Sequence, residues 1–355
     1  MSRKDNGQSS NGKRARADEA SVERPSVGSV TLSDVARLAG VGTTTVSRAL
    51  NHPDQVAQKT LKKVNQAIEL TGYVPNQIAG ALASRRSHLI AAIIPSISNT
   101  VYAETIKHFS KILRDSGYQV LLGETDYLED QEETLVRTVL SRKPDGIFFI
   151  GINHTAICRR QLLVANIPVV ETWDLTKTPL DMVVGFSHEE VGKAIAEYLL
   201  EKKISRVGSI WALDHRAQLR RKGFLETLAF HGINSKYVCD VSVPTNFGQG
   251  REGLTRLINE GFNGGAVVCS SDTIAHGVLA EAQTRGLRVP EEMAVTGFGD
   301  QTFAPFTNPS LTTVKFDREL IGRRAAEVLL ARINDEKIEE YIIDVGFEII
   351  ERKST

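Results

Sequence analysis

Apolar residues recur at helical spacing within the segment Val30–Val56. The first helix predicted there buries one face, formed by Leu32, Val35, Leu38 and Ala39. Thr31 is its candidate N-cap, and Asp34 adds negative charge to the first turn. Gly40-Val41-Gly42 ends this helix, because a tight corner needs residues that accept a left-handed backbone. The pattern therefore predicts two short helices joined by a glycine turn.

The second helix of this segment begins at Thr43 and has a polar outer side. Its inward positions are Val46, Ala49 and Leu50. Its outward positions are short hydroxyl side chains and one arginine: Thr43, Thr44, Thr45, Ser47 and Arg48. Such a face can enter the major groove of DNA and meet base edges and phosphates, although a solvated helical hairpin has the same polarity.

A third amphipathic helix is predicted over Gln58–Thr71, with five apolar positions: Leu61, Val64, Ala67, Ile68 and Leu70. A shorter helix, Gln77–Arg86, follows after Asn76, a natural N-cap. Because it is short and contains Gly80, this helix is marginal alone and is a candidate for folding on DNA. Residues 1–28 are polar and are expected to be a disordered tail.

From Leu89 onward, short apolar β-type runs alternate with helical segments. The predicted strands are Leu89–Pro95, Gln119–Gly123, Gly146–Gly151, Ile167–Glu171, Met182–Phe186, Arg206–Trp211, Val238–Val243, Ala266–Ser270 and Met293–Gly297. Strands that are apolar throughout and separated by helices indicate parallel sheets covered on both faces. Their number predicts two doubly wound lobes that face each other across a cleft, where ligands of such folds bind. Helix Arg318–Ile333 and strand Tyr341–Ile350 are expected to complete the lobes.

These patterns divide the 355 residues into four parts. They are a tail (1–28), a helical head (29–74), a hinge helix and linker (75–88) and a two-lobed core (89–355). Lysine and arginine together number 43, as do aspartate and glutamate, so the net charge does not indicate a nucleic-acid partner. The segment Val30–Arg86 is nevertheless mildly basic.

Several functional classes are disfavoured by what the sequence lacks. The three cysteines, Cys158, Cys239 and Cys269, form no CxxC pair, which predicts reduced residues in a cytoplasm and neither a disulfide framework nor a metal site. The chain has no apolar run near the ~20 residues of a membrane span and no signal-peptide core. No P-loop, GxSxG or HExxH motif is present, so we expect no catalytic residues, no cofactor and no enzyme.

Six motifs, in order along the chain, resemble the LacI/GalR family of bacterial transcriptional regulators. They are Thr31-Leu32-Ser33-Asp34-Val35-Ala36, Val46-Ser47-Arg48-Ala49-Leu50-Asn51, Gly72-Tyr73-Val74-Pro75-Asn76, Lys222-Gly223-Phe224, Ser271-Asp272-Thr273-Ile274-Ala275-His276-Gly277 and Pro309-Ser310-Leu311-Thr312-Thr313-Val314. The resemblance implies an all-α helix-turn-helix head followed by a two-lobed α/β core of the periplasmic-binding-protein type. It also implies a homodimer on a near-palindromic operator.

The family resemblance assigns DNA contacts to eight residues. Base contacts are implied for Thr43, Thr44 and Arg48, with Leu32 near the groove edge, and phosphate contacts for Thr31, Ser47 and Asn51. Leu82 matches the residue that the family inserts into the minor groove at the operator centre, where an apolar wedge unstacks a base step. A leucine that packs two hinge helices together is the alternative.

The resemblance also implies that a small effector binds between the lobes. Arg220 matches an arginine that grips the effector, although a surface arginine is the alternative. Gly299 stands where many sugar-binding relatives carry an acid, and the absence of this acid favours an anionic ligand. In this respect the sequence resembles the gluconate-repressor branch of the family. We therefore predict a sugar acid, such as gluconate or a ketogluconate. Further candidate contacts are Tyr102, Glu171, Trp173, Phe247, Ser271 and Asp272, of which Asp272 is equally an N-cap candidate and Tyr102 and Phe247 equally core residues.

Three functions remain to be compared. The first is a transcriptional regulator whose operator affinity is changed by the effector. Its favoured form is a repressor of sugar-acid metabolism genes. The second is a regulator of the same type that responds to a neutral sugar or a nucleoside. The third is a sugar-binding transport component, which is disfavoured because a transport protein does not need the amino-terminal helical head.

Overall fold

The computed structural model describes residues 30–74 and 86–355. The predicted tail and the predicted wedge residue Leu82 lie outside these ranges. The described residues belong to two compact units that divide at residue 80, and each is considered by itself. Among the described residues, no helix is both long and apolar enough to cross a membrane.

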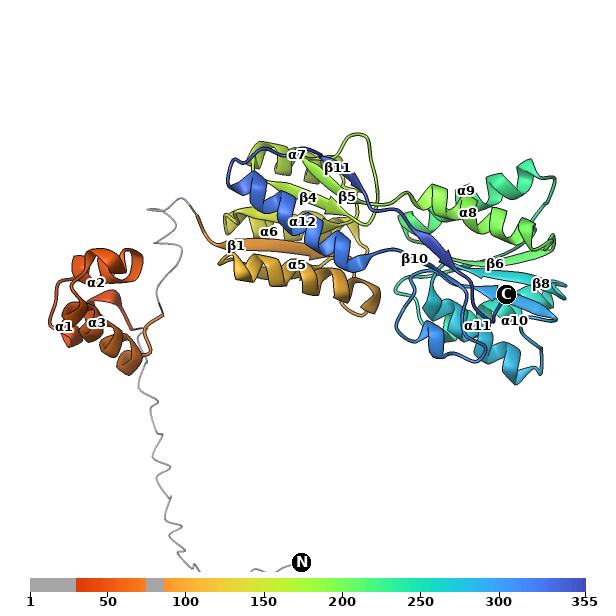
Figure 1. The fold of residues 1–355 in the computed structure, drawn as a ribbon, viewed down its shortest axis with the longest axis horizontal. Helices are drawn as coiled ribbons and strands as arrows, with labels where there is room; N and C mark the ends of the chain where they lie inside the picture. The colour runs from red at the N-terminus through yellow and green to blue at the C-terminus, as the bar shows by residue number, and fades with distance from the viewer. Residues whose placement is uncertain (1–29, 75–85) are drawn as a thin grey trace, which may run out of the picture. The chain divides into compact units, whose positions relative to one another are not determined.

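The first unit is a bundle of three helices (Figure 1). They are α1 (Leu32–Ala39), α2 (Thr43–Asn51) and α3 (Gln58–Thr71), with a 3₁₀ turn at Pro53–Gln55. Thr31 and Asp34 form a capping box at the start of α1, and Gly40 ends α1 in the left-handed conformation (φ 66°), as predicted. The small core consists of Val35, Ala36, Ala39, Val46, Ala49, Val64 and Ala67.

Two leucines that were predicted to face this core are instead exposed. Leu38 is 53% exposed and Leu70 is 78% exposed. At about 100° per residue, Leu38 lies off the stripe that Val35 and Ala39 define, and Leu70 lies on the far side of α3 from Leu61. The prediction for these two leucines was wrong because it relied on their apolar side chains and not on their angular positions around the helix.

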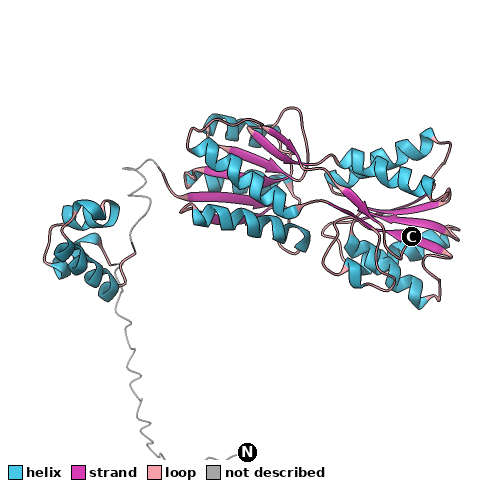
Figure 2. Cartoon of the chain, viewed as in Figure 1, coloured by secondary structure: helices cyan, strands magenta, loops and turns pink. Residues whose placement is uncertain are grey.

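The second unit consists of two lobes (Figure 2). Lobe one is built on a parallel sheet in the order β11-β5-β4-β3-β1-β2. Its strands are β1 (Leu89–Ile94), β2 (Gln119–Glu124), β3 (Gly146–Ile150), β4 (Val169–Thr172), β5 (Met182–Gly185) and β11 (Ile342–Asp344). Helices α5 (Ala103–Asp115) and α12 (Arg318–Ile333) pack on one face, where their apolar residues meet Ile90 and Phe148. Helices α6 (Glu129–Ser141) and α7 (Ala156–Ala165) cover the other face, against Ala91 and Phe149.

Lobe two is a smaller parallel sheet in the order β7-β6-β8-β9. Its strands are β6 (Val207–Ala212), β7 (Tyr237–Val241), β8 (Gly265–Cys269) and β9 (Met293–Thr296). Helices α8 (His188–Glu201) and α9 (His215–Phe230) lie against one face, and α10 (Phe247–Asn259) and α11 (Asp272–Thr284) against the other. Two glycines bring α8 and α9 into close contact: a Cβ on Gly192 would clash with the Arg220 carbonyl, and one on Gly223 with the Glu189 carbonyl. This close packing fixes the position of Arg220.

The chain passes between the lobes after β5, after β10 (Thr313–Lys315) and after β11. The last strand was predicted as one element, Tyr341–Ile350, which is wrong. Gly346 adopts a left-handed conformation (φ 66°) and divides it into β11, in the sheet of lobe one, and β12 (Glu348–Ile350), which pairs antiparallel with β10. The predicted helix Arg318–Ile333 is confirmed as α12.

Candidate DNA-binding face and effector cavity

The outer side of α2 carries the residues predicted to read DNA. Val46 and Ala49 are buried against the neighbouring helices, which leaves Thr43, Thr44 and Arg48 exposed on the opposite side. Because α2 follows α1 through a glycine corner, this face is presented as in a helix-turn-helix. The hydroxyl groups of Thr43 and Thr44 and the guanidinium of Arg48 are therefore accessible to DNA phosphates and base edges.

The other predicted DNA contacts lie at the two ends of this motif. Thr31 is exposed, but its hydroxyl group donates to Asp34 Oδ2 (2.7 Å), so a phosphate contact would compete with the capping box. Asn51 is exposed and donates from Nδ2 to the Ser47 carbonyl (3.0 Å), which stiffens the end of α2. Leu32 is half-buried and packs on the core of the head.

A cavity lies between the lobes, at the carboxyl ends of the strands of both sheets. Lobe one and lobe two both contribute residues to its wall: Asn99, Val101, Tyr102, Tyr127, Trp173, His188, Ala212, Asp214, Arg216, Arg220, Val243, Thr245, Ser270, Ser271, Phe298 and Gln301. The carboxyl ends of parallel strands are where ligands of doubly wound folds bind. We call this space the inner chamber.

Arg220 is the most constrained side chain of the inner chamber. It is 4% exposed, and it donates from Nη2 to the Ser270 carbonyl (2.9 Å) and from Nη1 to His188 Nδ1 (2.8 Å). His188 in turn donates from Nε2 to the Trp173 carbonyl (2.7 Å), which fixes a neutral imidazole. Burial and the neighbouring Arg220 hold the pKa of His188 well below its ordinary value. His188 is the first residue of α8, and it is buried in the wall of the inner chamber.

Arg216 lies one helical turn before Arg220 and faces the same space. Its Nη2 donates to the Tyr102 hydroxyl group (2.6 Å). Among the described residues, no carboxylate forms an ion pair with either arginine, as judged by a nitrogen–oxygen distance within 4.0 Å. Burial lowers the pKa of Arg220 to about 10, so its guanidinium is still charged at neutral pH. The inner chamber therefore holds two buried cations that make no direct ion pair among the described residues, although Asp214 and Asp174 lie near enough to interact with their charges.

Three side chains that line the inner chamber each carry a buried N–H donor without a hydrogen-bond acceptor: Trp173 Nε1, Arg216 Nη1 and Arg220 Nε. Leaving buried donors unpaired costs about 1–3 kcal/mol each, and more for charged groups. A ligand that brings acceptor oxygens removes this cost. The chamber therefore suits a molecule rich in oxygen atoms and carrying negative charge.

Four of the seven predicted effector contacts line the inner chamber: Tyr102, Trp173, Arg220 and Ser271. Tyr102 and Trp173 pack edge to face, with ring centroids 4.8 Å apart. Glu171, Phe247 and Asp272 do not line it. Glu171 is buried within β4, where its carboxylate accepts from the Leu180 amide (2.7 Å). Phe247 is half-exposed at the start of α10 and packs on His276 and Phe303.

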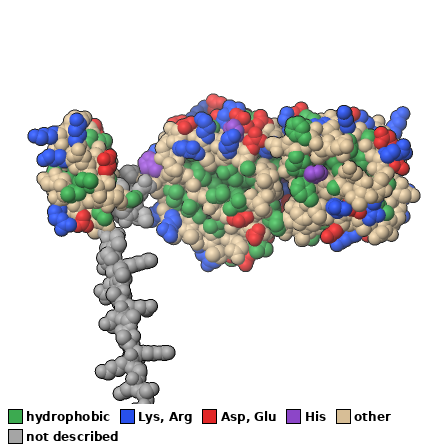
Figure 3. Space-filling model, turned by 90° about the horizontal axis from the view of Figure 1, so that it is seen from below, with side chains coloured by type: hydrophobic (Ala, Val, Ile, Leu, Met, Phe, Trp, Pro, Cys, Tyr) green, Lys and Arg blue, Asp and Glu red, His purple; other side chains and the backbone are tan. Residues whose placement is uncertain are grey.

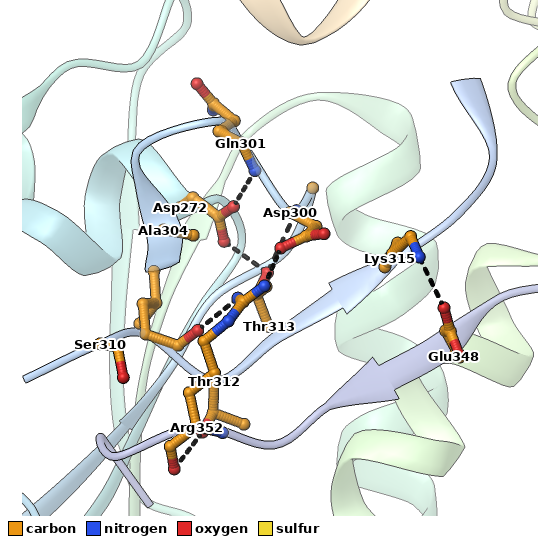
Figure 4. Close-up of polar contacts among 12 residues, drawn as sticks. Asp272, Asp300, Gln301, Ala304, Ser310, Thr312, Thr313, Lys315, Glu348 and Arg352 are labelled. Carbon is orange, nitrogen blue, oxygen red and sulfur yellow. Dashed lines mark hydrogen bonds and ion pairs between the residues drawn. The ribbon is translucent and has the colours of Figure 1, made fainter. Parts of the chain in front are cut away.

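Asp272 does not line the inner chamber and instead contacts Thr313 and Gln301 (Figure 4). Its carboxylate accepts from the Thr313 hydroxyl group (2.5 Å) and from the backbone N–H of Gln301 (2.7 Å). The N-cap of α11 is Ser271, and Asp272 is the first residue of the helix. The loop after β9 is thereby tied to α11 and β10, and that loop places Phe298 against the guanidinium of Arg220.

Sequence reasoning missed Arg216 and His188 as chamber residues. The helix that carries Arg220, α9, begins at His215 and is capped by Asp214, which accepts from the Ala217 amide (3.1 Å). An aspartate N-cap followed by arginines four positions apart was a readable signal, because such residues share one face of a helix.

The fold and the chamber together define a class of protein: a helix-turn-helix head joined to a two-lobed core that binds a small ligand. Residues 31–76 match the model of "Bacterial regulatory proteins, lacI family", and residues 196–355 match the "Periplasmic binding protein-like domain". The chain belongs to the lacI family of bacterial regulatory proteins, and it is a DNA-binding transcriptional regulator.

Similar proteins extend over almost the whole chain. An "HTH-type transcriptional regulator GntR" of Pseudomonas aeruginosa is 38% identical over 92% of this chain and 96% of its own length. One of the same name from Escherichia coli is 31% identical over 90% of this chain and 96% of its own length. A solved structure of a LacI-family regulator from Silicibacter pomeroyi superposes with a TM-score of 0.87 at 34% identity, covering 92% and 99% of the two chains.

Proposed function

We propose that this regulator represses genes of sugar-acid metabolism and that a sugar acid, such as gluconate or a ketogluconate, is its effector. The observation that carries the proposal is the pair of buried arginines, Arg216 and Arg220, without a carboxylate partner among the described residues. A buried charge is costly unless it is paired, and a ligand carboxylate supplies the missing partner. A neutral sugar or a nucleoside would bring no carboxylate to these guanidinium groups.

Gly299 adds a second argument for an anionic ligand. Its backbone is left-handed (φ +124°), which disfavours any residue with a side chain. A Cβ there would lie 3.3 Å from Val101 Cγ2 and 3.8 Å from Asp272 Oδ2, so an acid at this position would be both strained and close to another buried carboxylate. The site therefore keeps a repulsive group away from an incoming acid.

At the DNA end, we propose base contacts from Thr43, Thr44 and Arg48, with Leu32 at the groove edge. Phosphate contacts are proposed for Thr31, Ser47 and Asn51, and a minor-groove wedge for Leu82. The exposure of the outer side of α2 supports the first set. Threonine hydroxyls are short, so sequence selectivity is expected to depend on two heads binding together.

We further propose that the chain acts as a homodimer on a near-palindromic operator in the bacterial cytoplasm. Apolar side chains gather on the surface of lobe one (Figure 3). In the edge strand β2, Leu121 and Leu122 are 46% and 41% exposed. Exposed apolar area beside an unpaired strand edge is typical of an interface. The effector would then change operator affinity by shifting the lobes of the dimer.

Calorimetric titration of the full chain tests the effector proposal. Gluconate and ketogluconates are expected to bind with clear saturation, whereas glucose and galactose are expected to bind at least tenfold more weakly. Each charge-assisted hydrogen bond that a neutral sugar lacks is worth about 1.5–3 kcal/mol. Binding of the neutral hexoses alone would refute the proposal.

A further inference from the structure

A second cavity of about 280 Å³ adjoins the inner chamber, whose own volume is about 50 Å³. We call it the outer chamber. Four residues line both spaces: Tyr127, Asp214, Arg216 and Val243. The inner chamber is smaller than the 300–1,000 Å³ of typical ligand sites, whereas the two together reach that range. A six-carbon ligand that enters the inner chamber therefore has to extend into the outer one.

Arg216 stands at the division between the chambers. Its Nη2 is bonded to Tyr102 in the inner chamber, whereas its Nη1 is directed toward Gly151, which lines only the outer one. A Cβ built on Gly151 would lie 3.8 Å from this nitrogen, and Nη1 is buried without an acceptor. One guanidinium thus offers a donor to each side.

The outer chamber differs from the inner one in its charge. Three carboxylates line it and not the inner chamber, those of Glu129, Glu132 and Asp174, while Asp214 lines both. His154 is bonded through Nδ1 to Glu132 (2.7 Å). Asp174 is 3% exposed, and its Oδ2 has no hydrogen-bond partner, while its Oδ1 accepts from the Leu175 amide (2.8 Å). An unpaired acceptor and an unpaired donor in one cavity suit hydroxyl groups, which act as both.

We propose that the two chambers form one extended site for an open-chain polyhydroxy acid, with its carboxylate in the inner chamber and its hydroxylated chain in the outer chamber. The inference rests on the proposed function, and it adds the orientation and the length of the ligand. The carboxylate meets Arg220 and Trp173 Nε1, and Arg216 Nη1 and Asp174 Oδ2 hold the hydroxyl groups. The acidic outer wall excludes the reverse orientation, because like charges repel.

Titration calorimetry with acids of increasing length tests this site on the unmodified chain. Glycerate, threonate and gluconate carry three, four and six carbons, and glucitol has the six-carbon hydroxyl chain without the carboxylate. Affinity is expected to rise at least about tenfold from glycerate to gluconate, and glucitol is expected to bind more weakly than gluconate by a similar factor. Equal affinities along the acid series would overturn the two-chamber site alone. Failure of every acid to bind would overturn it together with the proposed function.

The variant Asp174→Asn tests whether the hydroxylated end of the ligand lies in the outer chamber. The amide oxygen of asparagine can still accept from the Leu175 amide, so the local fold is preserved. The variant is expected to bind gluconate about tenfold more weakly and glycerate within twofold of the unmodified chain. Asp240→Asn is the matched control, because Asp240 pairs with Arg221 on the surface and lines neither chamber. Equal losses for glycerate and gluconate in Asp174→Asn would overturn the proposed orientation.

Discussion

The guanidinium carbon of Arg220 lies 3.7 Å from the centroid of the Phe298 ring. The two side chains come from α9 and from the loop after β9, and the contact is buried between the lobes. A cation over an aromatic face is worth up to about 2 kcal/mol when water is excluded. With the Ser270 carbonyl and His188 holding two of its nitrogens, Arg220 is oriented before any ligand arrives.

Replacing Arg220 with lysine is expected to weaken gluconate binding by about 10–100-fold, because an ammonium group cannot reproduce the planar fork of donors. Titration calorimetry measures the change. Arg221→Lys is the control, since Arg221 faces outward and pairs with Asp240 (3.0 Å). Similar losses in the two variants would mean that Arg220 is not the residue that grips the acid.

Arg318 connects the loop that carries Phe298 to lobe one. Its Nε donates to Glu104 on α5 (2.8 Å), while its other nitrogens donate to the carbonyls of Gly299 and Asp300. Arg318→Gln is expected to weaken effector binding about 3–10-fold, because the loop loses contacts of about 1 kcal/mol net. Arg323→Gln on the same helix is the control, since Arg323 is exposed and pairs at 3.9 Å with Glu327 on its own helix. Unchanged effector affinity in Arg318→Gln would contradict this role.

Two buried carboxyl groups make the stability of the core depend on pH. Burial raises the pKa of Asp174 and of Asp272 to about 6, from an ordinary value of 3.8. Between these values the folded state binds more protons than the unfolded state, so the contribution of each group to stability falls as pH rises from about 4 to about 6. The loss is on the order of 2–3 kcal/mol for each group.

Urea unfolding followed by the fluorescence of the buried Trp173 and Trp211 measures this dependence. Asp174→Asn is expected to unfold at higher urea than the unmodified chain at pH 7 and at nearly the same urea at pH 4. A parallel pH dependence in the two chains would show that Asp174 titrates normally.

Arg48 is expected to carry sequence selectivity in the head. Arg48→Ala should weaken operator binding by about 1–3 kcal/mol, because a bidentate contact with a base is lost. Arg48→Lys retains the charge without the fork, so it should keep binding to unrelated DNA while it loses preference for the operator. Gel-shift titrations on operator and scrambled duplexes separate these effects, and full operator preference in Arg48→Lys would contradict base contact.

Much of the fold could be predicted from the sequence because local chemistry determines it. The capping box at Thr31 and the glycine corner at Gly40 follow from a few neighbouring residues, and continuous apolar runs identify the buried strands. Prediction from residue type fails at Leu38, because its apolar side chain suggested burial, whereas its angular position on α1 leaves it exposed.

The chamber was less predictable because it depends on where side chains point in three dimensions. Ser271 and Asp272 are neighbours in sequence, yet Ser271 lines the inner chamber while Asp272 faces Thr313 behind it. Arg216 lies in the first turn of α9, and it shares the chamber-facing side of that helix with Arg220 only because α9 begins at His215. His188 becomes a chamber residue only when α8 and α9 pack together and bring Arg220 against it.

The central claim is that a sugar acid held by Arg220 controls DNA binding by the head. Operator affinity of the full chain, measured by gel-shift titration with and without saturating gluconate, tests it most directly when Arg220→Met is measured in parallel. The account predicts that gluconate changes operator affinity of the unmodified chain at least about fivefold, a coupling typical of allosteric proteins, and does not change that of the variant. An operator affinity unaffected by gluconate, or an equal response in Arg220→Met, would contradict it.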